Sequence, residues 1–159
     1  MDVVLTEITA ELAGTATPPA GCRFARGWPA PFWEETLAAV AGGRKDRAWY
    51  VLRPATRVVG VIGASDMGGA VARVGYGIVN SQQGRGNATA ALRALIAELC
   101  GNGFERVIGE TFVDHAGSRR VMEKAGMHEA GTRKEEADGV SCELVVYQIE
   151  CARRRRAQG

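Results

Sequence analysis

The chain has 159 residues, of which 46% are hydrophobic and 24% charged, so a wholly disordered protein is excluded and one domain is expected. It has 20 basic and 18 acidic residues, and four of the basic ones are Arg153–Arg156. The rest of the chain is therefore near neutral and offers no strongly basic surface for nucleic acid. No apolar stretch approaches the roughly 20 residues of a membrane span, and the N-terminus lacks the features of a secretory signal. We expect a cytoplasmic protein that binds neither DNA nor a membrane.

We expect a single domain over residues 1–152, followed by a basic, solvated and frayed tail over residues 153–159. Contact of this tail with RNA or an acidic partner is the alternative. The four cysteines are Cys22, Cys100, Cys142 and Cys151, and no pair has the spacing of a zinc or redox motif. Four reduced thiols and no metal site are therefore expected.

The front of the chain is predicted to be irregular and then helical. Glycines and prolines are dense between Ala13 and Pro31, which predicts a long loop of the kind that often serves as a lid. A helix is expected from Pro31, with acidic residues in its first turn, to the pair Gly42–Gly43.

The rest of the chain alternates strands and helices. Strands are expected over 48–52, 57–63, 70–79, 106–112, 128–134 and 142–149, with turns at 54–56, 67–69 and 138–139. A helix beginning near Ala88 has apolar residues at helical spacing and ends at Gly101 or Gly103. A shorter helix is expected over 118–125. A helix between two strands implies a parallel pair with a right-handed crossover, so the fold class is a mixed α/β sheet.

The most informative segment is the glycine-rich turn between the strand 70–79 and the helix that begins near Ala88. Helix N-termini leave free N–H groups and carry a partial positive charge, so such a turn can hold a phosphate group. Gly84 and Gly86 leave room for the ligand to approach. The segment lacks the lysine of a P-loop and the last glycine of a dinucleotide-binding fingerprint, where Thr89 stands. A tight turn without a ligand is the alternative.

Two blocks of the sequence resemble the GNAT superfamily of N-acetyltransferases. Gln83-x-x-Gly86-x-Ala88 matches the family's Gln/Arg-x-x-Gly-x-Gly/Ala signature. The segment from Ser118 to Met127 is similar to a second block, in the variant common among ribosomal-protein N-terminal acetyltransferases. The resemblance covers about residues 71–147.

The resemblance implies a twisted, mixed sheet of six to seven strands with about four helices and splayed central parallel strands. It also implies acetyl-CoA as cofactor. The loop is then expected to hold the diphosphate through backbone N–H groups, and the pantetheine arm to pair with the backbone of Ile78 and Val79. The residues assigned to the loop are Gln83, Gly84, Arg85, Gly86, Asn87 and Ala88.

Candidate catalytic residues follow from the same resemblance. Glu110, on the strand that faces the gap, is the candidate general base, and an ion pair with a nearby arginine is the alternative. Ser118 is the candidate for contacting or protonating the departing sulfur, and it is also expected to cap the following helix.

The chain departs from the family pattern at two positions. His115 stands where many members have asparagine; it is a candidate cofactor contact, with a solvent-facing loop residue as the alternative. Met122 stands where other branches have a tyrosine that acts as general acid, which leaves Ser118 or water for that role.

Remaining basic and aromatic residues have two interpretations each. Arg119, Arg120 and Lys124 are candidates for the 3′-phosphate of CoA or for a solvated helix face. Trp28 and Tyr76 are candidate acceptor contacts, whereas Trp33 is expected in the core.

We therefore predict acetyl transfer to a primary amine of a peptide N-terminus or a small molecule, by a monomer or homodimer. A non-catalytic acyl-CoA sensor is the alternative function.

Overall fold

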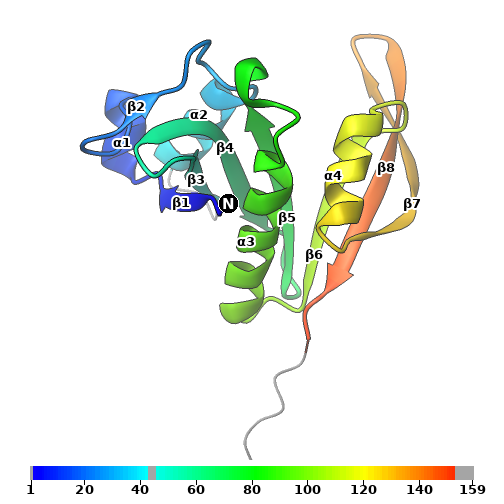
Figure 1. The fold of residues 1–159 in the computed structure, drawn as a ribbon. Helices are drawn as coiled ribbons and strands as arrows, with labels where there is room; N and C mark the ends of the chain where they lie inside the picture. The colour runs from blue at the N-terminus through cyan, green and yellow to red at the C-terminus, as the bar shows by residue number, and fades with distance from the viewer. Residues whose placement is uncertain (1, 43–45, 153–159) are drawn as a thin grey trace, which may run out of the picture.

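The computed structural model describes residues 2–42 and 46–152, and within them the chain forms one twisted sheet with helices on both faces (Figure 1). The strands are β1 Val4–Glu7, β2 Arg23–Phe24, β3 Asp46–Leu52, β4 Arg57–Asp66, β5 Val71–Ile78, β6 Arg106–Phe112, β7 His128–Ala137 and β8 Val140–Glu150. The helices are α1 Ala10–Thr15, α2 Trp33–Ala41, the 3-10 turn η1 Asn80–Gln82, α3 Asn87–Gly101 and α4 Ala116–Lys124. The basic tail predicted over 153–159 lies outside the described residues.

The strand order is β1-β3-β4-β5-β6-β8-β7, and β2 pairs with β4 beside this path. β5 and β6 are parallel, as the intervening helix predicts, and the β3–β4 and β7–β8 pairs are antiparallel. The mixed α/β class and all six predicted strands are confirmed. β1 and β2 raise the number of described strands to eight. They were missed because β1 is four residues long and β2 two, too short for a period-2 pattern to be recognised.

Side chains alternate between the two faces of the sheet and build two apolar clusters. Trp49 and Val51 of β3 point to the face covered by α3 and α4, whereas Tyr50 and Leu52 point to the face covered by α1 and α2. α3 buries five apolar side chains against the first face: Ala91, Leu92, Leu95, Ile96 and Leu99. The predicted amphipathic helix is therefore confirmed, and its apolar stripe anchors it on the sheet.

The long loop predicted between Ala13 and Pro31 is only partly irregular. Residues 13–15 belong to α1, which Thr9 caps by accepting from the Leu12 N–H at 3.2 Å, and β2 interrupts the rest. Aromatic burial explains the order of this segment. Phe24, Trp28, Trp33 and Tyr50 form one cluster of stacked and edge-on rings. Trp33 is 9% exposed, so its predicted core position is confirmed.

The expectation of four reduced thiols is wrong. Cys100, at the end of α3, and Cys151, just after β8, form a disulfide, while Cys22 and Cys142 are free. Sequence spacing did not suggest the pair because 51 residues separate the two cysteines, and only the folded sheet brings their elements together. No described helix is long and apolar enough to cross a membrane.

Candidate active site

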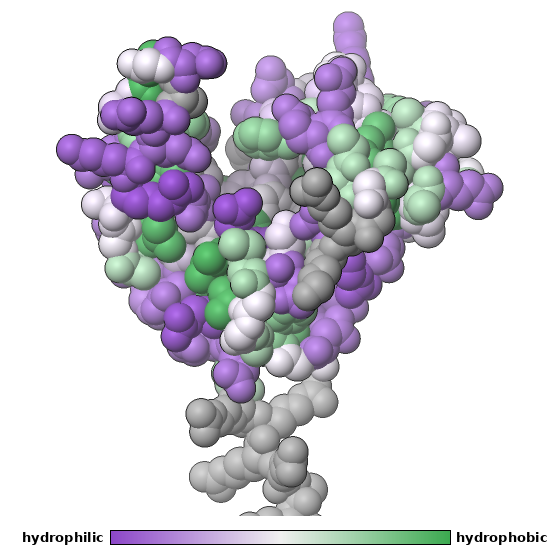
Figure 2. Space-filling model, turned by 180° about the vertical axis from the view of Figure 1, so that it is seen from behind, coloured by the Kyte–Doolittle hydropathy of each residue, from purple (hydrophilic) through white to green (hydrophobic). Residues whose placement is uncertain are grey.

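The central parallel strands separate halfway along their length. β5 pairs with β6 only from Val71 to Val74, opposite Arg106 to Gly109. The flanking ladders continue further, to Ile78 between β4 and β5 and to Phe112 between β6 and β8. The strands therefore diverge beyond Val74 and Gly109, as predicted. Figure 2, seen from behind, shows a notch between the two halves of the molecule.

The backbone of β5 turns open polar groups toward this gap. Val79 donates its N–H to Val59 O at 2.9 Å, and bonded pairs alternate along an antiparallel ladder. Tyr76 and Ile78 therefore direct their backbone groups away from β4, toward β6. Ile78 O accepts from Gln83 Nε2 at 3.0 Å, so Ile78 contributes its N–H. Of the two residues predicted to meet the pantetheine arm, Ile78 faces the gap, whereas the Val79 N–H is used within the sheet.

The loop between β5 and α3 presents open N–H groups at the mouth of the gap. Among the described residues, none accepts a hydrogen bond from the N–H groups of Gly84, Arg85, Gly86, Asn87 or Ala88. The N–H of Gln83 differs, because it donates to Asn80 O at 3.3 Å. Gly84 and Gly86 have left-handed φ values of 72° and 78°, which glycine adopts without strain. The loop is therefore shaped for an anion at the N-terminus of α3.

Polar contacts with different degrees of burial hold this loop in place. Asn87 is 2% exposed, and its Nδ2 donates to Gln82 O at 2.9 Å. Its Oδ1 accepts from Arg53 Nη1 at 2.8 Å, and the same nitrogen donates to Arg85 O at 3.1 Å. The sequence did not indicate Arg53, which directly follows β3, because no local motif connects residues more than 30 positions apart.

Glu110 and Ser118 lie on opposite faces of the sheet. A Cβ added at Gly109 would meet Met122 of α4, so the neighbouring Glu110 points to the other face. There Arg133 of β7, also missed from the sequence, donates from Nε to Glu110 Oε2 at 3.0 Å and from Nη2 to the same oxygen. Within the described part of the chain, Glu110 Oε1 has no hydrogen-bond partner. The alternative of an arginine ion pair is thus realised, and one carboxylate oxygen remains open.

Tyr76 and Ser118 meet across the gap on the α3–α4 face. The Tyr76 hydroxyl lies 2.9 Å from Ser118 Oγ and also donates to Ser118 O at 3.2 Å. Burial raises the pKa of Tyr76, and the Ser118 hydrogen bond partly offsets this effect. The phenol therefore keeps its proton at neutral pH.

The predicted capping role of Ser118 belongs to His115 instead. His115 is the N-cap of α4, and its Nδ1 accepts from the Ser118 N–H at 3.0 Å. Ser118 lies two residues inside the helix, so its hydroxyl is free to reach Tyr76. His115 is exposed, and the sequence did not indicate its cap role because histidine is an uncommon N-cap residue.

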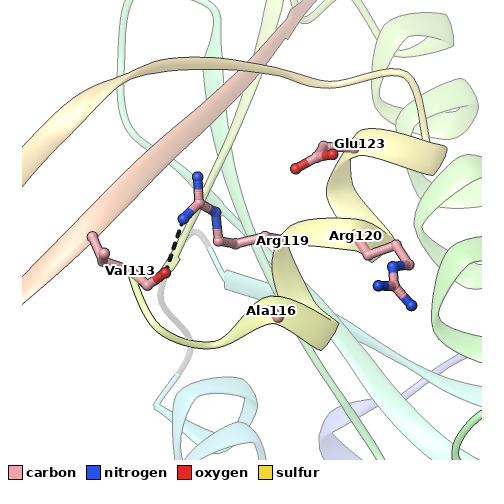
Figure 3. Close-up of a pocket in the computed structure, with 5 residues that line it drawn as sticks. All are labelled: Val113, Ala116, Arg119, Arg120 and Glu123. Atoms are coloured by element: carbon pink, nitrogen blue, oxygen red, sulfur yellow. Dashed lines mark hydrogen bonds between the residues drawn. The ribbon is translucent and has the colours of Figure 1, made fainter.

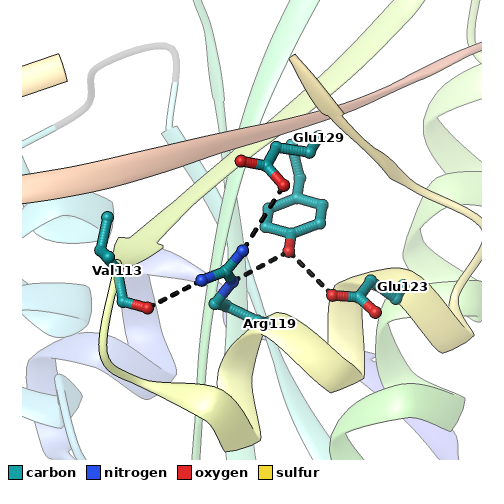
Figure 4. Close-up of polar contacts among 5 residues, drawn as sticks. Val113, Arg119, Glu123 and Glu129 are labelled. Atoms are coloured by element: carbon teal, nitrogen blue, oxygen red, sulfur yellow. Dashed lines mark hydrogen bonds and ion pairs between the residues drawn. The ribbon is translucent and has the colours of Figure 1, made fainter. Parts of the chain in front are cut away.

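The Arg119 side chain forms hydrogen bonds and an ion pair within the protein. It donates to Val113 O at 2.9 Å and to the Tyr147 hydroxyl at 3.2 Å, and it pairs with Glu129 at 3.4 Å (Figure 4). Tyr147 in turn donates to Glu123 at 2.9 Å. Arg119 thus ties α4 to β7 and β8.

A cavity of about 240 Å³ lies beside α4 (Figure 3). Its lining residues are Val113, Ala116, Arg119, Arg120 and Glu123. Arg120 points away from Arg119 in this view, and both Arg120 and Lys124 are exposed. These two side chains, rather than Arg119, are therefore accessible to a phosphate group.

Trp28 packs inside the aromatic cluster. Its ring stacks on Phe24 at a centroid distance of 4.3 Å and meets Trp33 edge-on at 5.0 Å. Its Nε1 is buried and has no hydrogen-bond partner among the described residues. Its acceptor-contact role stays a prediction.

Comparison with known proteins identifies the family. Residues 13–128 match the model of the acetyltransferase (GNAT) domain. No curated protein sequence matches the chain.

Solved structures with the same fold include three acetyltransferases. The microcin C7 self-immunity acetyltransferase MccE, in complex with acetyl-CoA and AMP, is 25% identical, covers 75% of this chain and 68% of its own, and has a TM-score of 0.64. The ribosomal L7/L12 α-N-protein acetyltransferase RimL, in complex with coenzyme A, is 18% identical, with 94% of each chain covered and a TM-score of 0.71. A chimera of the Vibrio cholerae spermidine N-acetyltransferase SpeG is 13% identical, covers 94% and 96%, and has a TM-score of 0.71.

Proposed function

Because the chain belongs to the GNAT acetyltransferase family, we propose that it transfers the acetyl group of acetyl-CoA directly to a primary amine, without a covalent enzyme intermediate. The observation that carries this proposal is the row of five open N–H groups over residues 84–88 at the mouth of the gap between β5 and β6. A hydrogen bond to a charged acceptor contributes roughly 1.5–3 kcal/mol, so several of these groups together suffice to bind the diphosphate of CoA. Acetyl-CoA, the cofactor expected from the sequence, is the cofactor of this family and fits this loop.

The gap between the strands connects the two faces of the sheet. Glu110 lies on one face, and Ser118 with Tyr76 lies on the other. If the amine attacks the thioester from the face that carries Glu110, the sulfur leaves on the opposite face, which carries Ser118. This separation suits direct transfer, because the nucleophile and the leaving group need different proton-transfer partners.

Glu110 is proposed to accept the proton of the amine through Oε1. Arg133 binds the other oxygen and thereby fixes the orientation of the carboxylate. Making an α-amine neutral at pH 7 costs about 1.4 kcal/mol, whereas a lysine amine costs about 4.6 kcal/mol. A single ion-paired carboxylate is therefore a better match to an α-amine than to a lysine side chain.

The hydroxyl pair of Ser118 and Tyr76 is proposed to donate a hydrogen bond to the sulfur as it departs. The two oxygens are 2.9 Å apart, so a proton given up by one can be replaced from the other, and the pair then regains one proton from solvent. Met122, in the position of the tyrosine found in other branches, is 2% exposed and packs in the core. Its side chain has no proton to give.

The acceptor class stays open between a peptide N-terminus and a small-molecule amine. The similar structures carry names of both kinds, an α-N-protein acetyltransferase and a spermidine N-acetyltransferase. A cytoplasmic location, a monomeric or homodimeric state and the absence of DNA binding stay predictions. The Cys100–Cys151 disulfide is a reason to test the location, because cytosolic thiols are usually reduced.

A sensor that binds acyl-CoA without turnover is the second candidate. The ion pair between Glu110 and Arg133 favours it, since this pair reduces the freedom of the carboxylate that is proposed as the base. The two candidates agree on cofactor binding and differ only in turnover.

The test has a binding arm and a turnover arm. Acetyl-CoA at about 100 times its Kd should add about 2.7 kcal/mol to the free energy of unfolding, which raises Tm by roughly 5–10 °C for a chain of this size. Pantetheine, which lacks the diphosphate, should give little shift at the same concentration. Release of CoA thiol is then followed over amino acids, polyamines and short peptides. Absence of a shift with acetyl-CoA would overturn the proposal, and binding without thiol release over the whole panel would favour the sensor.

A further inference from the structure

Arg53 is partly buried, directly follows β3, and connects the β3–β4 turn to the loop between β5 and α3. Its own backbone is fixed in the β3–β4 turn, because its N–H donates to Arg57 O at 2.9 Å and its carbonyl accepts from Arg57 Nε at 3.1 Å. Its side chain, partly shielded from solvent, leaves this turn and reaches the loop and the first residue of α3. The guanidinium is therefore held by the β3–β4 turn of the sheet and not by the loop that it contacts.

The contact with Arg85 determines the direction of a peptide group in the loop. Arg53 Nη1 donates to Arg85 O at 3.1 Å. In a trans peptide the carbonyl and the following N–H point in opposite directions. Since Arg53 holds the Arg85 carbonyl on its own side, the Gly86 N–H is directed away from Arg53. Gly86 is one of the five residues whose N–H groups have no acceptor within the described chain.

The contact with Asn87 fixes the other end of the loop. Asn87 Oδ1 accepts from Arg53 at 2.8 Å, while its Nδ2 donates to Gln82 O at 2.9 Å. A chain of hydrogen bonds therefore runs from Arg53 through Asn87 to Gln82 and closes the loop across its base. An isolated loop with glycines at two of its positions would sample many conformations, and ordering them on binding would reduce affinity.

We propose that Arg53 is a positioning residue for the cofactor: it preorganises the Gly84–Ala88 N–H groups to receive the diphosphate, without itself touching the nucleotide. The inference rests on the proposed function, since the diphosphate is that of acetyl-CoA. A guanidinium suits this role because its fixed, planar donors reach two acceptors at once.

The experiment compares CoA affinity among matched variants by titration calorimetry. Arg53→Met should raise the Kd for CoA about tenfold, equivalent to losing one charge-assisted hydrogen bond to the diphosphate. Arg53→Lys should give an intermediate value. Arg47→Met is the control, because it removes the same charge from β3, the strand that directly precedes Arg53, and Arg47 pairs there with Glu7. Its Kd should stay within about twofold of the wild type.

A double-mutant cycle tests whether Arg53 acts through Asn87. If both residues belong to one chain of contacts, the double variant Arg53→Met with Asn87→Ala should raise the Kd for CoA little more than the more damaging single substitution does. Additive losses of CoA affinity would show that Arg53 does not act through Asn87. The amide signals of Gly84 and Gly86 should also shift in Arg53→Met without ligand, which gives a readout independent of activity, while signals from β7 and β8 should not.

Dephospho-CoA, which lacks the 3′-phosphate, separates positioning from direct contact. Loss of affinity for both ligands in Arg53→Met supports positioning at the diphosphate, whereas loss for CoA alone would show that Arg53 contacts the 3′-phosphate and would overturn the inference. An unchanged Kd in Arg53→Met would also overturn it and would leave the proposed function standing. Failure of the wild type to bind CoA is the separate result that would remove the proposed function.

Discussion

Glycine at position 77 shows how single residues shape the site. A Cβ built there would collide with the backbone of Pro31 in the segment before α2, whereas one built at Gly75, two residues earlier on the same strand and face, would meet nothing within 4 Å. Neither residue has a positive φ. The requirement for glycine at position 77 is therefore one of space, and it lets the α1–α2 layer lie close to β5.

We expect Gly77→Ala to lower the free energy of unfolding by about 1–3 kcal/mol, the usual effect of forcing extra volume into a packed contact. Gly75→Ala is the matched control and should change the free energy of unfolding by less than about 1 kcal/mol. Urea unfolding of both variants measures the difference. Equal midpoints would contradict the close contact with Pro31.

Glu110 is the second residue whose role depends on its immediate neighbours. Its side chain is 19% exposed and is bound by Arg133 through one oxygen. The Glu110 carboxylate raises the pKa of the Arg133 guanidinium, so the arginine stays charged over the whole working range of pH.

We expect Glu110→Gln to lower kcat by about 10²–10⁴-fold, the usual contribution of a general base, with the Kd for CoA unchanged. Glu135→Gln is the control, because Glu135 is the other carboxylate near Arg133, at 3.8 Å and 55% exposed. Its kcat should be that of the wild type. A Glu110→Gln enzyme with full turnover would assign proton removal to water.

At the scale of elements, α4 is positioned by its two ends and its flank. His115 caps its first turn, Arg119 and Glu123 bind β7 and β8 through Glu129 and Tyr147, and the Lys124 carbonyl accepts from Arg93 of α3 at 2.7 Å. The first turn carries Ser118, so the geometry of the Ser118–Tyr76 pair depends on the cap.

Replacing His115 by alanine should cost about 1 kcal/mol of stability, the typical value of an N-cap hydrogen bond. It should also weaken the Ser118–Tyr76 contact, because the first turn of α4 frays. His115→Asn keeps a cap acceptor and should restore most of the lost stability, as measured by thermal unfolding. If asparagine and alanine are equally destabilising, the Nδ1–Ser118 hydrogen bond is not what stabilises the turn.

At the scale of the whole molecule, the disulfide joins the two halves that flank the gap. α3 packs on β5, while β8 pairs with β6, so Cys100–Cys151 links the strands at the end where they are still paired. The halves can diverge at the other end without separating altogether. The notch in Figure 2 thus has a closed base.

The disulfide closes a loop of 51 residues. Its removal is therefore expected to lower the free energy of unfolding by about 4 kcal/mol. Cys100→Ser should show this loss in urea unfolding under oxidising conditions. Cys142→Ser, which replaces a free thiol, should have the same free energy of unfolding as the wild type. Addition of a reducing agent should lower the free energy of unfolding of the wild type to that of Cys100→Ser. If reduction leaves the wild-type value unchanged, the disulfide does not form in solution.

The sequence determined the class of this protein because its signals are local. Alternation and helical spacing located six strands and the long helix, and two short blocks identified the family, since a loop that binds a diphosphate needs its glycines and its helix start within a few consecutive residues. The ion pair of Glu110 with Arg133, the contact of Tyr76 with Ser118, the disulfide and the connection from Arg53 to the loop were decided by the tertiary structure. Each joins residues more than 20 positions apart, and such contacts are set by strand order and packing, which no local pattern encodes.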